Sequence, residues 1–261
     1  MPPQPPQARQ HWTSPRPGGV KALSVESSPL SLRYRARNMI AEPRHVRRRD
    51  QAARVVNVIV AVIGIVITAP LMALVALAVK LTSRGPVIFT QQRVGIDRRR
   101  NRGAEETESH RRRSDRGGKI FTIYKFRTMR VDGGRKQRWA SRNDPRITPI
   151  GKFLRATRLD ELPQFFNVLK GDMNIVGPRP EQPDIFAELH GELGRRYRSR
   201  QRVLPGITGL AQVELGYDTD LDGVRRKVDM DLAYIRKRSA SKDLEIMAKT
   251  VPVMVFRKVW M

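Results

Sequence analysis

Two adjacent carboxylates, Asp160 and Glu161, are the residues of this sequence best suited to chemistry. They stand at the start of an apolar pattern with the i, i+3, i+4, i+7 spacing of a buried helix face, made of Leu162, Phe165, Phe166 and Leu169. Pro163 fits a helix only in its first turn, and Lys170-Gly171 is a typical C-terminal stop. The pattern therefore predicts a short amphipathic helix that begins near Asp160.

The acidic pair would then lie at a helix N-terminus. There the macrodipole and the unpaired N–H groups keep a carboxylate ionised and favour a bound phosphate. Adjacent helical side chains diverge by about 100°, so Asp160 and Glu161 can take two different tasks. A simpler interpretation is that Asp160 is an N-cap and Glu161 a first-turn acid. These residues alone leave both interpretations open.

Composition limits the kinds of chemistry that are available. The 261-residue chain has a formal net charge of +26, which suits a phosphate-rich partner, either a nucleic acid or an anionic membrane. It has no cysteine, which excludes disulfides, thiolate metal sites and a cysteine nucleophile. Its four histidines are scattered, which argues against a histidine metal cage or a Ser-His-Asp triad. Catalysis would rest on carboxylates, Lys, Arg or hydroxyls.

The N-terminal part of the chain changes character abruptly. Residues 1–50 are rich in Pro and Arg, which predicts a disordered basic tail. Residues 55–79 are apolar apart from Asn57 and Thr68, long enough for a hydrocarbon core of about 30 Å. The alternative, a buried core helix, is disfavoured because soluble helices seldom run this long without a charge.

Basic residues flank both ends of this apolar segment, so the positive-inside rule places both ends in the cytoplasm. One straight span cannot satisfy that. Pro70 in the middle would bend the helix. We therefore expect a re-entrant helical hairpin over residues 51–82.

Residues 83–261 would form a catalytic domain with short strands at 87–89 and 121–129, the second delivering Lys125 and Arg127 on one face. The Arg-rich insertion 97–119 is typical of a solvated loop, with a lipid or nucleic-acid patch as the alternative. Thr148 and Pro149 predict the start of a helix with an apolar stripe of Ile150, Phe153 and Leu154, and residues 243–256 predict a terminal helix.

Arg179 is held between Pro178 and Pro180. This is either a simple turn with a surface salt bridge or a pre-organised guanidinium that binds an anion such as phosphate.

Four ordered stretches carry a resemblance to a known family: SRGPVIFTQQRVG, FTIYKFRTM, TPIGKFLRATRLDELPQFFNVLKGDMNIVGPRPE and VLPGITGLAQV. Residues from about 54 to 259 resemble the bacterial sugar transferase family, the monotopic phosphoglycosyl transferases, in their minimal form. The resemblance implies an α+β, mainly helical, monotopic membrane protein with a re-entrant helical hairpin and a cytoplasmic catalytic domain. It also implies transfer of a sugar 1-phosphate from a UDP-sugar to a polyprenyl phosphate, release of UMP, and Mg²⁺ as cofactor.

The same resemblance assigns roles to residues. It implies that Asp160 is the nucleophile, forming an aspartyl-phosphosugar intermediate, and that Glu161 holds Mg²⁺ on the diphosphate. The substrate-binding residues that we expect beside this pair are Lys125, Arg127, Arg158, Gln164, Pro178, Arg179 and Pro180.

The implied partners are UDP-sugar, polyprenyl phosphate and membrane lipid at the cytoplasmic face of a bacterial inner membrane, with a homo-oligomer left open. An alternative is a catalytically silent, membrane-anchored basic scaffold of polysaccharide machinery, which explains the charge but not Asp160-Glu161 beside Pro163. A nucleic-acid binder is disfavoured, because the arginines lack interleaved aromatics.

Overall fold

The computed structural model describes residues 44–97, 117–130, 144–215 and 221–256. The chain divides into two units, Met1–Ile40 and Ala41–Met261, and all described residues belong to the second. The predicted tail 1–50, except residues 44–50, and nearly all of the insertion 97–119 lie outside the described residues. The described part is mainly helical with short strands, as predicted.

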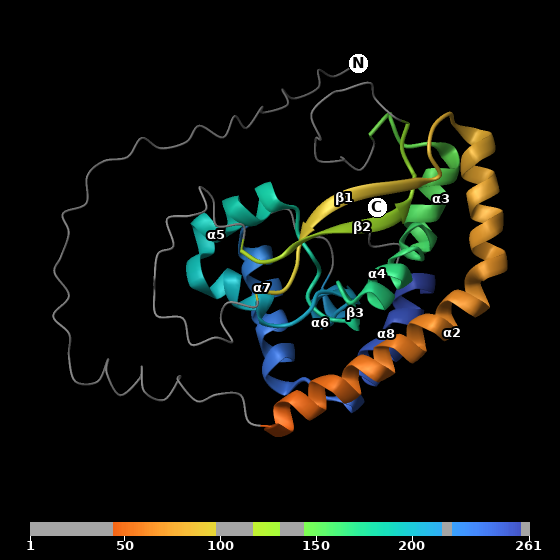
Figure 1. The fold of residues 1–261 in the computed structure, drawn as a ribbon. Coiled ribbons are helices and arrows are strands. Elements are labelled where there is room, and N and C mark those ends of the chain that lie inside the picture. The colour runs from red at the N-terminus through yellow and green to blue at the C-terminus, as the bar shows by residue number, and fades with distance from the viewer. Residues whose placement is uncertain (1–43, 98–116, 131–143, 216–220, 257–261) are drawn as a thin grey trace, which may run out of the picture. The chain divides into compact units, whose positions relative to one another are not determined.

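A long helix, α2 (Arg44–Thr82), contains the predicted membrane segment and Pro70. Its stretch Gln51–Thr82 is the one helix of the described ranges that is long and apolar enough to cross a membrane. Figure 1 shows that α2 bends part of the way along its length. A proline inside a helix removes one hydrogen bond and clashes with the preceding turn, so Pro70 accounts for a bend.

Both arms of α2 pack on the rest of the unit. In the first arm, Arg54 donates to the carbonyls of Val168 and Leu169 at 2.5 and 2.9 Å, and Asn57 accepts the N–H of Ile175 at 2.6 Å. In the second arm, the buried residues Val75 and Val79 pack with Phe126 and Leu154. The other face of α2 exposes large apolar side chains, including Ile63, Ile67, Leu74 and Leu81.

Strands β1 (Ile88–Val94) and β2 (Ile120–Phe126) form an antiparallel pair, with Ile88 opposite Phe126 and Val94 opposite Ile120. The expected first strand, 87–89, is therefore too short. The edge of β2 is covered by Asn167, which accepts the N–H of Tyr124 and donates to the carbonyl of Thr122. This side chain extends the sheet's hydrogen bonding to the next helix.

Helix α3 (Pro149–Thr157) begins as predicted, since the Thr148 hydroxyl accepts the N–H of Gly151 at 3.0 Å. Its expected apolar stripe is wrong at Phe153, which is exposed while Leu154 is buried.

The helix expected to begin at Asp160 is α4, and it begins later, at Gln164, and ends at Lys170. Asp160 and Glu161 instead lie in a separate 3-10 turn, η2 (Leu159–Glu161). The turn follows from i to i+3 bonds on both sides of Pro163, which has no N–H to complete an α-helical turn. The predicted C-terminus is correct, because Gly171 caps α4 with φ 82°. The predicted buried face is wrong at Phe166, which is exposed, and the buried side chains are Gln164, Asn167 and Val168.

The remainder comprises two parallel strands, three further α-helices before the last, and a second 3-10 turn. They are β3 (Asn174–Val176), α5 (Pro183–Arg198), η3 (Ser199–Arg202), β4 (Gly206–Thr208), α6 (Leu210–Glu214) and α7 (Leu221–Lys237). The last helix, α8 (Ala240–Phe256), was predicted.

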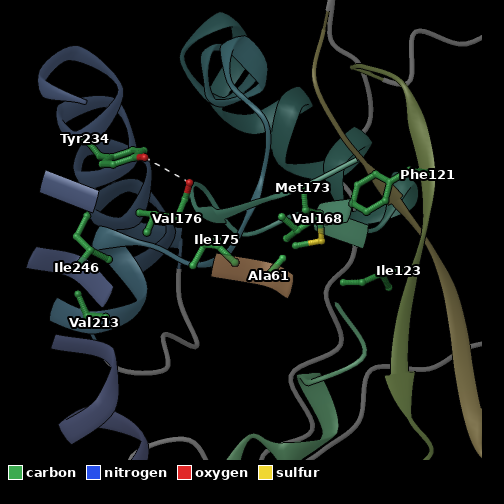
Figure 2. Close-up of a cluster of buried hydrophobic side chains, with 10 residues drawn as sticks. All are labelled: Ala61, Phe121, Ile123, Val168, Met173, Ile175, Val176, Val213, Tyr234 and Ile246. Carbon is green, nitrogen blue, oxygen red and sulfur yellow. Dashed lines mark hydrogen bonds between the residues drawn. The ribbon is translucent and has the colours of Figure 1, made fainter. Parts of the chain in front are cut away.

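Figure 2 shows the largest buried cluster, in which Ala61 of α2 lies among side chains from β2, α4, β3, α6, α7 and α8. The Tyr234 hydroxyl donates to the carbonyl of Val176 across this cluster. The apolar helix α2 is thus part of the same core that supports the turn η2.

Candidate active site

The acidic pair is held in an unusual backbone conformation between α3 and α4. Arg158 ends α3 with φ 56°, and among the described residues it is the one non-glycine residue with positive φ. Such a conformation costs of order 1–3 kcal/mol and is concentrated at functional sites. It ends α3, and Asp160 and Glu161, both less than 10 % exposed, follow directly in η2.

Glu161 is the centre of a cluster of cations. Its Oε1 accepts from Lys125 Nζ at 2.6 Å and lies 3.4 Å from Arg179 Nη2, and its Oε2 lies 3.9 Å from Arg158 Nη1. Burial by itself would raise the pKa of Glu161, but Lys125, then Arg179 and Arg158, outweigh it and hold this pKa well below its usual range. Glu161 is therefore ionised at any physiological pH.

Asp160 has a different environment, although it is the next residue. Its carboxylate makes no hydrogen bond or ion pair with another residue of the described ranges. Burial raises the pKa of Asp160 to about 6, opposed by Lys125 and reinforced by the charge of Glu161. An unpaired, poorly solvated carboxylate is more nucleophilic than one whose lone pairs are occupied, and carboxylates of this kind attack phosphorus in aspartyl-phosphate enzymes. Two neighbouring carboxylates thus have separate chemical capacities.

Arg179 extends to Glu161 from a backbone segment that is held in place by hydrogen bonds to its carbonyls. Each of the four carbonyls of residues 178–181 accepts a hydrogen bond from a different donor. The pairs are Pro178 with Gly206 N (3.0 Å), Arg179 with Arg200 Nη2 (3.1 Å), Pro180 with Arg93 Nη1 (3.0 Å), and Glu181 with Val94 N (2.8 Å). We call residues 178–181, with these four bonds, the clamped segment.

The donor to Arg179 is itself fixed by a buried ion pair. Arg200 Nε donates to Asp231 Oδ2 at 2.7 Å, and both side chains are about 5 % exposed. Asp231 belongs to α7 and Arg200 to η3, so the ion pair links both to the segment that aims Arg179. Buried, hydrogen-bonded pairs of this kind specify one geometry, at a considerable desolvation cost.

Arg93 is a site residue that the sequence interpretation missed. It lines a cavity of about 10 Å³, room for roughly one water molecule, together with Lys125, Glu161, Gln164, Arg179 and Pro180. In the register of β1 and β2, Arg93 opposes Phe121 and Phe89 opposes Lys125, so Arg93 and Lys125 share one face of the pair. A longer first strand in the prediction would have revealed this.

Most of the predicted substrate-binding residues gather at the acidic pair. Lys125, Arg158 and Arg179 contact Glu161, and Gln164 and Pro180 line the small cavity beside it. Pro178 belongs to the clamped segment, where its carbonyl accepts from the N–H of Gly206.

Arg127 is not brought to the acidic pair. Its buried guanidinium donates to the carbonyl and hydroxyl of Ser83 at 2.6 and 2.9 Å, beyond the C-terminus of α2. The last carbonyls of a helix have no partners within it, and a cation there also complements the helix dipole. Arg127 therefore holds the end of α2, and the expectation that it neutralises a diphosphate beside Lys125 is not supported by its position.

The donor chemistry of the pair suits Mg²⁺. In the part of the chain that the structure describes, no group of three or more His, Asp or Glu side chains gathers as a metal site. Mg²⁺ in phosphoryl-transfer sites, however, is bound through one or two carboxylates plus substrate phosphates. Glu161 Oε2, whose nearest ion-pair contact is the long one to Arg158, is the available carboxylate oxygen.

Comparison with known proteins identifies relatives across this region. A family model described as bacterial sugar transferase matches residues 48–103 and 106–257. A protein of Aeromonas hydrophila named UDP-N-acetylgalactosamine-undecaprenyl-phosphate N-acetylgalactosaminephosphotransferase is 41% identical over 199 residues, 76% of this chain and 42% of the relative.

Two further relatives are named UDP-glucose:undecaprenyl-phosphate glucose-1-phosphate transferase. The protein of Klebsiella pneumoniae is 41% identical over 201 residues, 76% of this chain and 39% of the relative. The protein of Caulobacter vibrioides is 38% identical over 212 residues, 79% of this chain and 70% of the relative. The chain spans about two fifths of the length of the Aeromonas and Klebsiella relatives.

Proposed function

Because this chain belongs to the bacterial sugar transferase family, we propose that it transfers a sugar 1-phosphate from a UDP-sugar to a polyprenyl phosphate. Relatives at about 40% identity carry names that state such a reaction with undecaprenyl phosphate. The observation that carries the proposal is the unpaired, buried carboxylate of Asp160 beside a second carboxylate surrounded by cations. That arrangement suits a nucleophile and a diphosphate in one site.

In the first step, an Oδ of Asp160 attacks the sugar-linked phosphorus of the UDP-sugar. A bond forms between Asp160 and that phosphorus, and the bond to the bridging oxygen breaks. The electron pair leaves with the bridging oxygen, and UMP is released. The product on the enzyme is an aspartyl-phosphosugar, a mixed anhydride that stays reactive toward phosphate.

In the second step, a phosphate oxygen of the polyprenyl phosphate attacks the same phosphorus. The bond to Asp160 breaks, and the carboxylate is regenerated with its electron pair. The product is a polyprenyl diphosphate sugar. No proton or electron has to be supplied in either step, which agrees with an active site without a histidine among the residues that line it.

The cations neutralise charge as it moves. Phosphoryl transfer depends above all on positioning and on electrostatic stabilisation of the transferred group. Lys125, Arg158, Arg179 and Arg93 surround the pair, and a diphosphate can replace Glu161 as the partner of two or three of them. The small volume between these side chains implies that they move apart when the nucleotide binds.

Mg²⁺ is part of the proposal. When bound, it would neutralise and orient the diphosphate as a Lewis acid. Glu161 would hold it with an oxygen that is already ionised at physiological pH.

The proposal places the enzyme on one face of a membrane, with α2 as a re-entrant hairpin. Both arms of α2 contact the same catalytic unit, through Asn57 and Ala61 in the first arm and Val79 in the second. A straight 32-residue helix is about 48 Å long and would carry its second half across a hydrocarbon core of about 30 Å. Contacts of both arms with one unit support a bent helix that enters and returns, at the cytoplasmic face of the bacterial inner membrane.

The experiment is UMP release by the detergent-purified protein with polyprenyl phosphate and Mg²⁺ across a panel of UDP-sugars. We expect release from at least one sugar, and loss of release in Asp160→Asn. Asp222→Asn is a matched control, because it removes an exposed carboxylate on the surface of α7. Without acceptor, one equivalent of UMP should be released and a sugar phosphate should remain on the wild-type protein.

Two outcomes would contradict the proposal. Full turnover by Asp160→Asn would remove the covalent mechanism and leave direct attack by the lipid phosphate. Silence of the folded wild type across the panel would count against the transferase itself.

A further inference from the structure

A second and larger cavity adjoins Glu161 and extends between α2 and α8. Its volume is about 220 Å³, and its lining is almost entirely apolar. The walls come from α2, η2, α4, β3, β4, α6 and α8, with Val60, Phe165, Ile207, Val213 and Met247 among the side chains. A cavity of roughly 150 Å³ with such a lining accepts benzene, so this one has room for about two five-carbon units.

The two ends of the cavity differ in chemistry. Arg158 and Glu161 form one end, directly beside Asp160. Val251 lines the other part and is nevertheless 63% exposed, so the cavity opens at the surface of α8. Val251 lies on the same face of α8 as the exposed Leu244, two helical turns away. The opening is therefore apolar, and the closed end is charged, with Arg158 beside Glu161.

We propose that this cavity binds the isoprene units next to the phosphate of the lipid acceptor and thereby directs that phosphate to Arg158. The inference rests on the proposed function, since it assigns the acceptor's position in the same site. A branched apolar chain with one terminal phosphate has the same order of groups as the cavity: an apolar part, then a cation, then the reacting carboxylate. The UDP-sugar, which is polar throughout, is left to the side of Arg93, Lys125 and Arg179.

A phospholipid fits the cavity less well. It has two chains, and its phosphate is a diester with a further headgroup, whereas the closed end offers one arginine beside the buried Glu161. A single chain matches the cavity in size, and its terminal phosphate monoester can accept hydrogen bonds from Arg158. The acceptor is therefore the occupant to which the structure points.

The first test uses chain length. The second isoprene unit buries further apolar surface in the cavity, so the wild-type KM should fall at least about tenfold from dimethylallyl phosphate, with five carbons, to geranyl phosphate, with ten. Met247→Trp replaces a flexible thioether chain in the cavity wall with a bulky indole ring, and it should abolish that fall in KM. Leu244→Trp adds the same ring to the same helix outside the cavity and should keep it. The KM for the UDP-sugar should be unchanged in both variants.

The second test measures binding without turnover. A geranyl phosphate that carries a small diazirine on its second isoprene unit is irradiated with the full-length protein in detergent, and the labelled peptides are mapped. We expect label on the peptides of α6 and α8 that line the cavity, competition by geranyl phosphate, and much weaker competition by phosphatidylglycerol. Label elsewhere, or equal competition by phosphatidylglycerol, would overturn the assignment.

The two proposals can fail separately. Labelling of the cavity without UMP release from any UDP-sugar would retain the acceptor site and reject the transferase. UMP release and lipid product with an unchanged chain-length effect in Met247→Trp would retain the transferase and reject the cavity as the acceptor site.

Discussion

Asp160 and Glu161 are consecutive residues with opposite electrostatic environments. Glu161 has three cations around it, whereas Asp160 is buried without a partner in the described ranges. Peptide chemistry alone would give the two side chains nearly equal pKa values. Their separation is produced by the turn η2 and by Lys125, which lies nearer to one carboxylate than to the other.

The first prediction at this scale concerns pH. Because burial raises the pKa of Asp160 to about 6, the nucleophilic form is lost as the pH falls through that value. We expect the rate of acceptor-independent UMP release to fall about tenfold per pH unit below pH 6. Stopped-flow measurements from pH 4.5 to 8 would show this limb. A rate that is flat down to pH 4.5 would contradict it, because Glu161 remains ionised throughout.

The second prediction concerns stability and has opposite signs at the two acids. A raised pKa means that the folded state binds a proton more tightly than the unfolded state, so Asp160 stabilises the fold below about pH 4 and this contribution is lost as the pH rises through 6. A shift from 3.8 to about 6 corresponds to about 3 kcal/mol at most. Asp160→Asn should therefore raise the melting temperature at pH 7.5 while it abolishes turnover.

Glu161→Gln should do the reverse. It leaves Lys125, a largely buried cation, without its partner, and loss of one member of a buried pair costs roughly 3–5 kcal/mol. Thermal unfolding of both variants in the same detergent decides the matter. Equal shifts of the same sign would show that the two carboxylates share one environment.

Residue types in a pattern revealed much of the site, but not all of it. The adjacent acids and the Pro-Arg-Pro sequence indicated Asp160, Glu161 and Arg179 without any coordinates. Arg93 was missed and Arg127 was misplaced for one reason: each depends on where a strand ends relative to another element. Arg127 is two residues beyond Lys125, and that distance is enough to bring it to Ser83, just after the C-terminus of α2, instead of Glu161.

At the scale of elements, the clamped segment 178–181 determines where Arg179 points. Its donors come from β1, η3 and β4, which are far apart in the sequence. Gly206 permits the close approach of β4 to the residues just before this segment, because a Cβ there would collide with the backbone of Gly177 and Val176. The two prolines can be recognised in the sequence, whereas the donors that bind the carbonyls of this segment are determined by the fold.

The prediction at this scale separates positioning from stability. Arg200→Met alone leaves the buried Asp231 unpaired and should destabilise the fold by roughly 3–5 kcal/mol. Arg200→Met with Asp231→Leu removes both charges and should recover most of that stability. The double variant still lacks the hydrogen bond to the carbonyl of Arg179, so we expect a higher KM for the UDP-sugar with the acceptor KM unchanged.

Arg200→Lys is the conservative control, because it retains the charge beside Asp231. A double variant with wild-type KM for the UDP-sugar would show that the ion pair supports only the fold. The melting temperature and the two KM values together distinguish these results.

The same scale explains why the helix expected at Asp160 is displaced. Periodicity identified an apolar helix after the acids and its glycine stop correctly, but it cannot distinguish an α-helical turn from a 3-10 turn. Phe166 is exposed because the most buried positions of α4 are taken by Asn167, which completes the edge of β2, and by Val168. A pattern of apolar residues does not predict the burial of a polar residue that is held by backbone hydrogen bonds, as Asn167 is.

For the whole molecule, the main question is how α2 can serve both the membrane and the core. Arg54 and Asn57 would be costly within lipid, but here they bind the carbonyls at the end of α4 and the N–H of Ile175. The remaining face of α2 exposes apolar residues over its whole apolar stretch, and α8 adds Leu244 and Val251. Composition predicted an anchor, and the packing shows which face of α2 stays exposed.

The topology prediction follows from this packing. The chain has no cysteine, so single engineered cysteines report their own positions. We expect Asp50→Cys and Arg84→Cys, which bracket the apolar stretch of α2, to react with a membrane-impermeant maleimide from the cytoplasmic side only, in inverted vesicles and not in intact spheroplasts. Ile67→Cys, on the exposed apolar face of α2, is the matched control and should react only after detergent is added. Labelling of positions 50 and 84 from opposite sides would show a spanning helix. That result could not be reconciled with Asn57 and Val79 both packing on one catalytic unit. The helix α2 would then have to separate from the core when it enters the membrane.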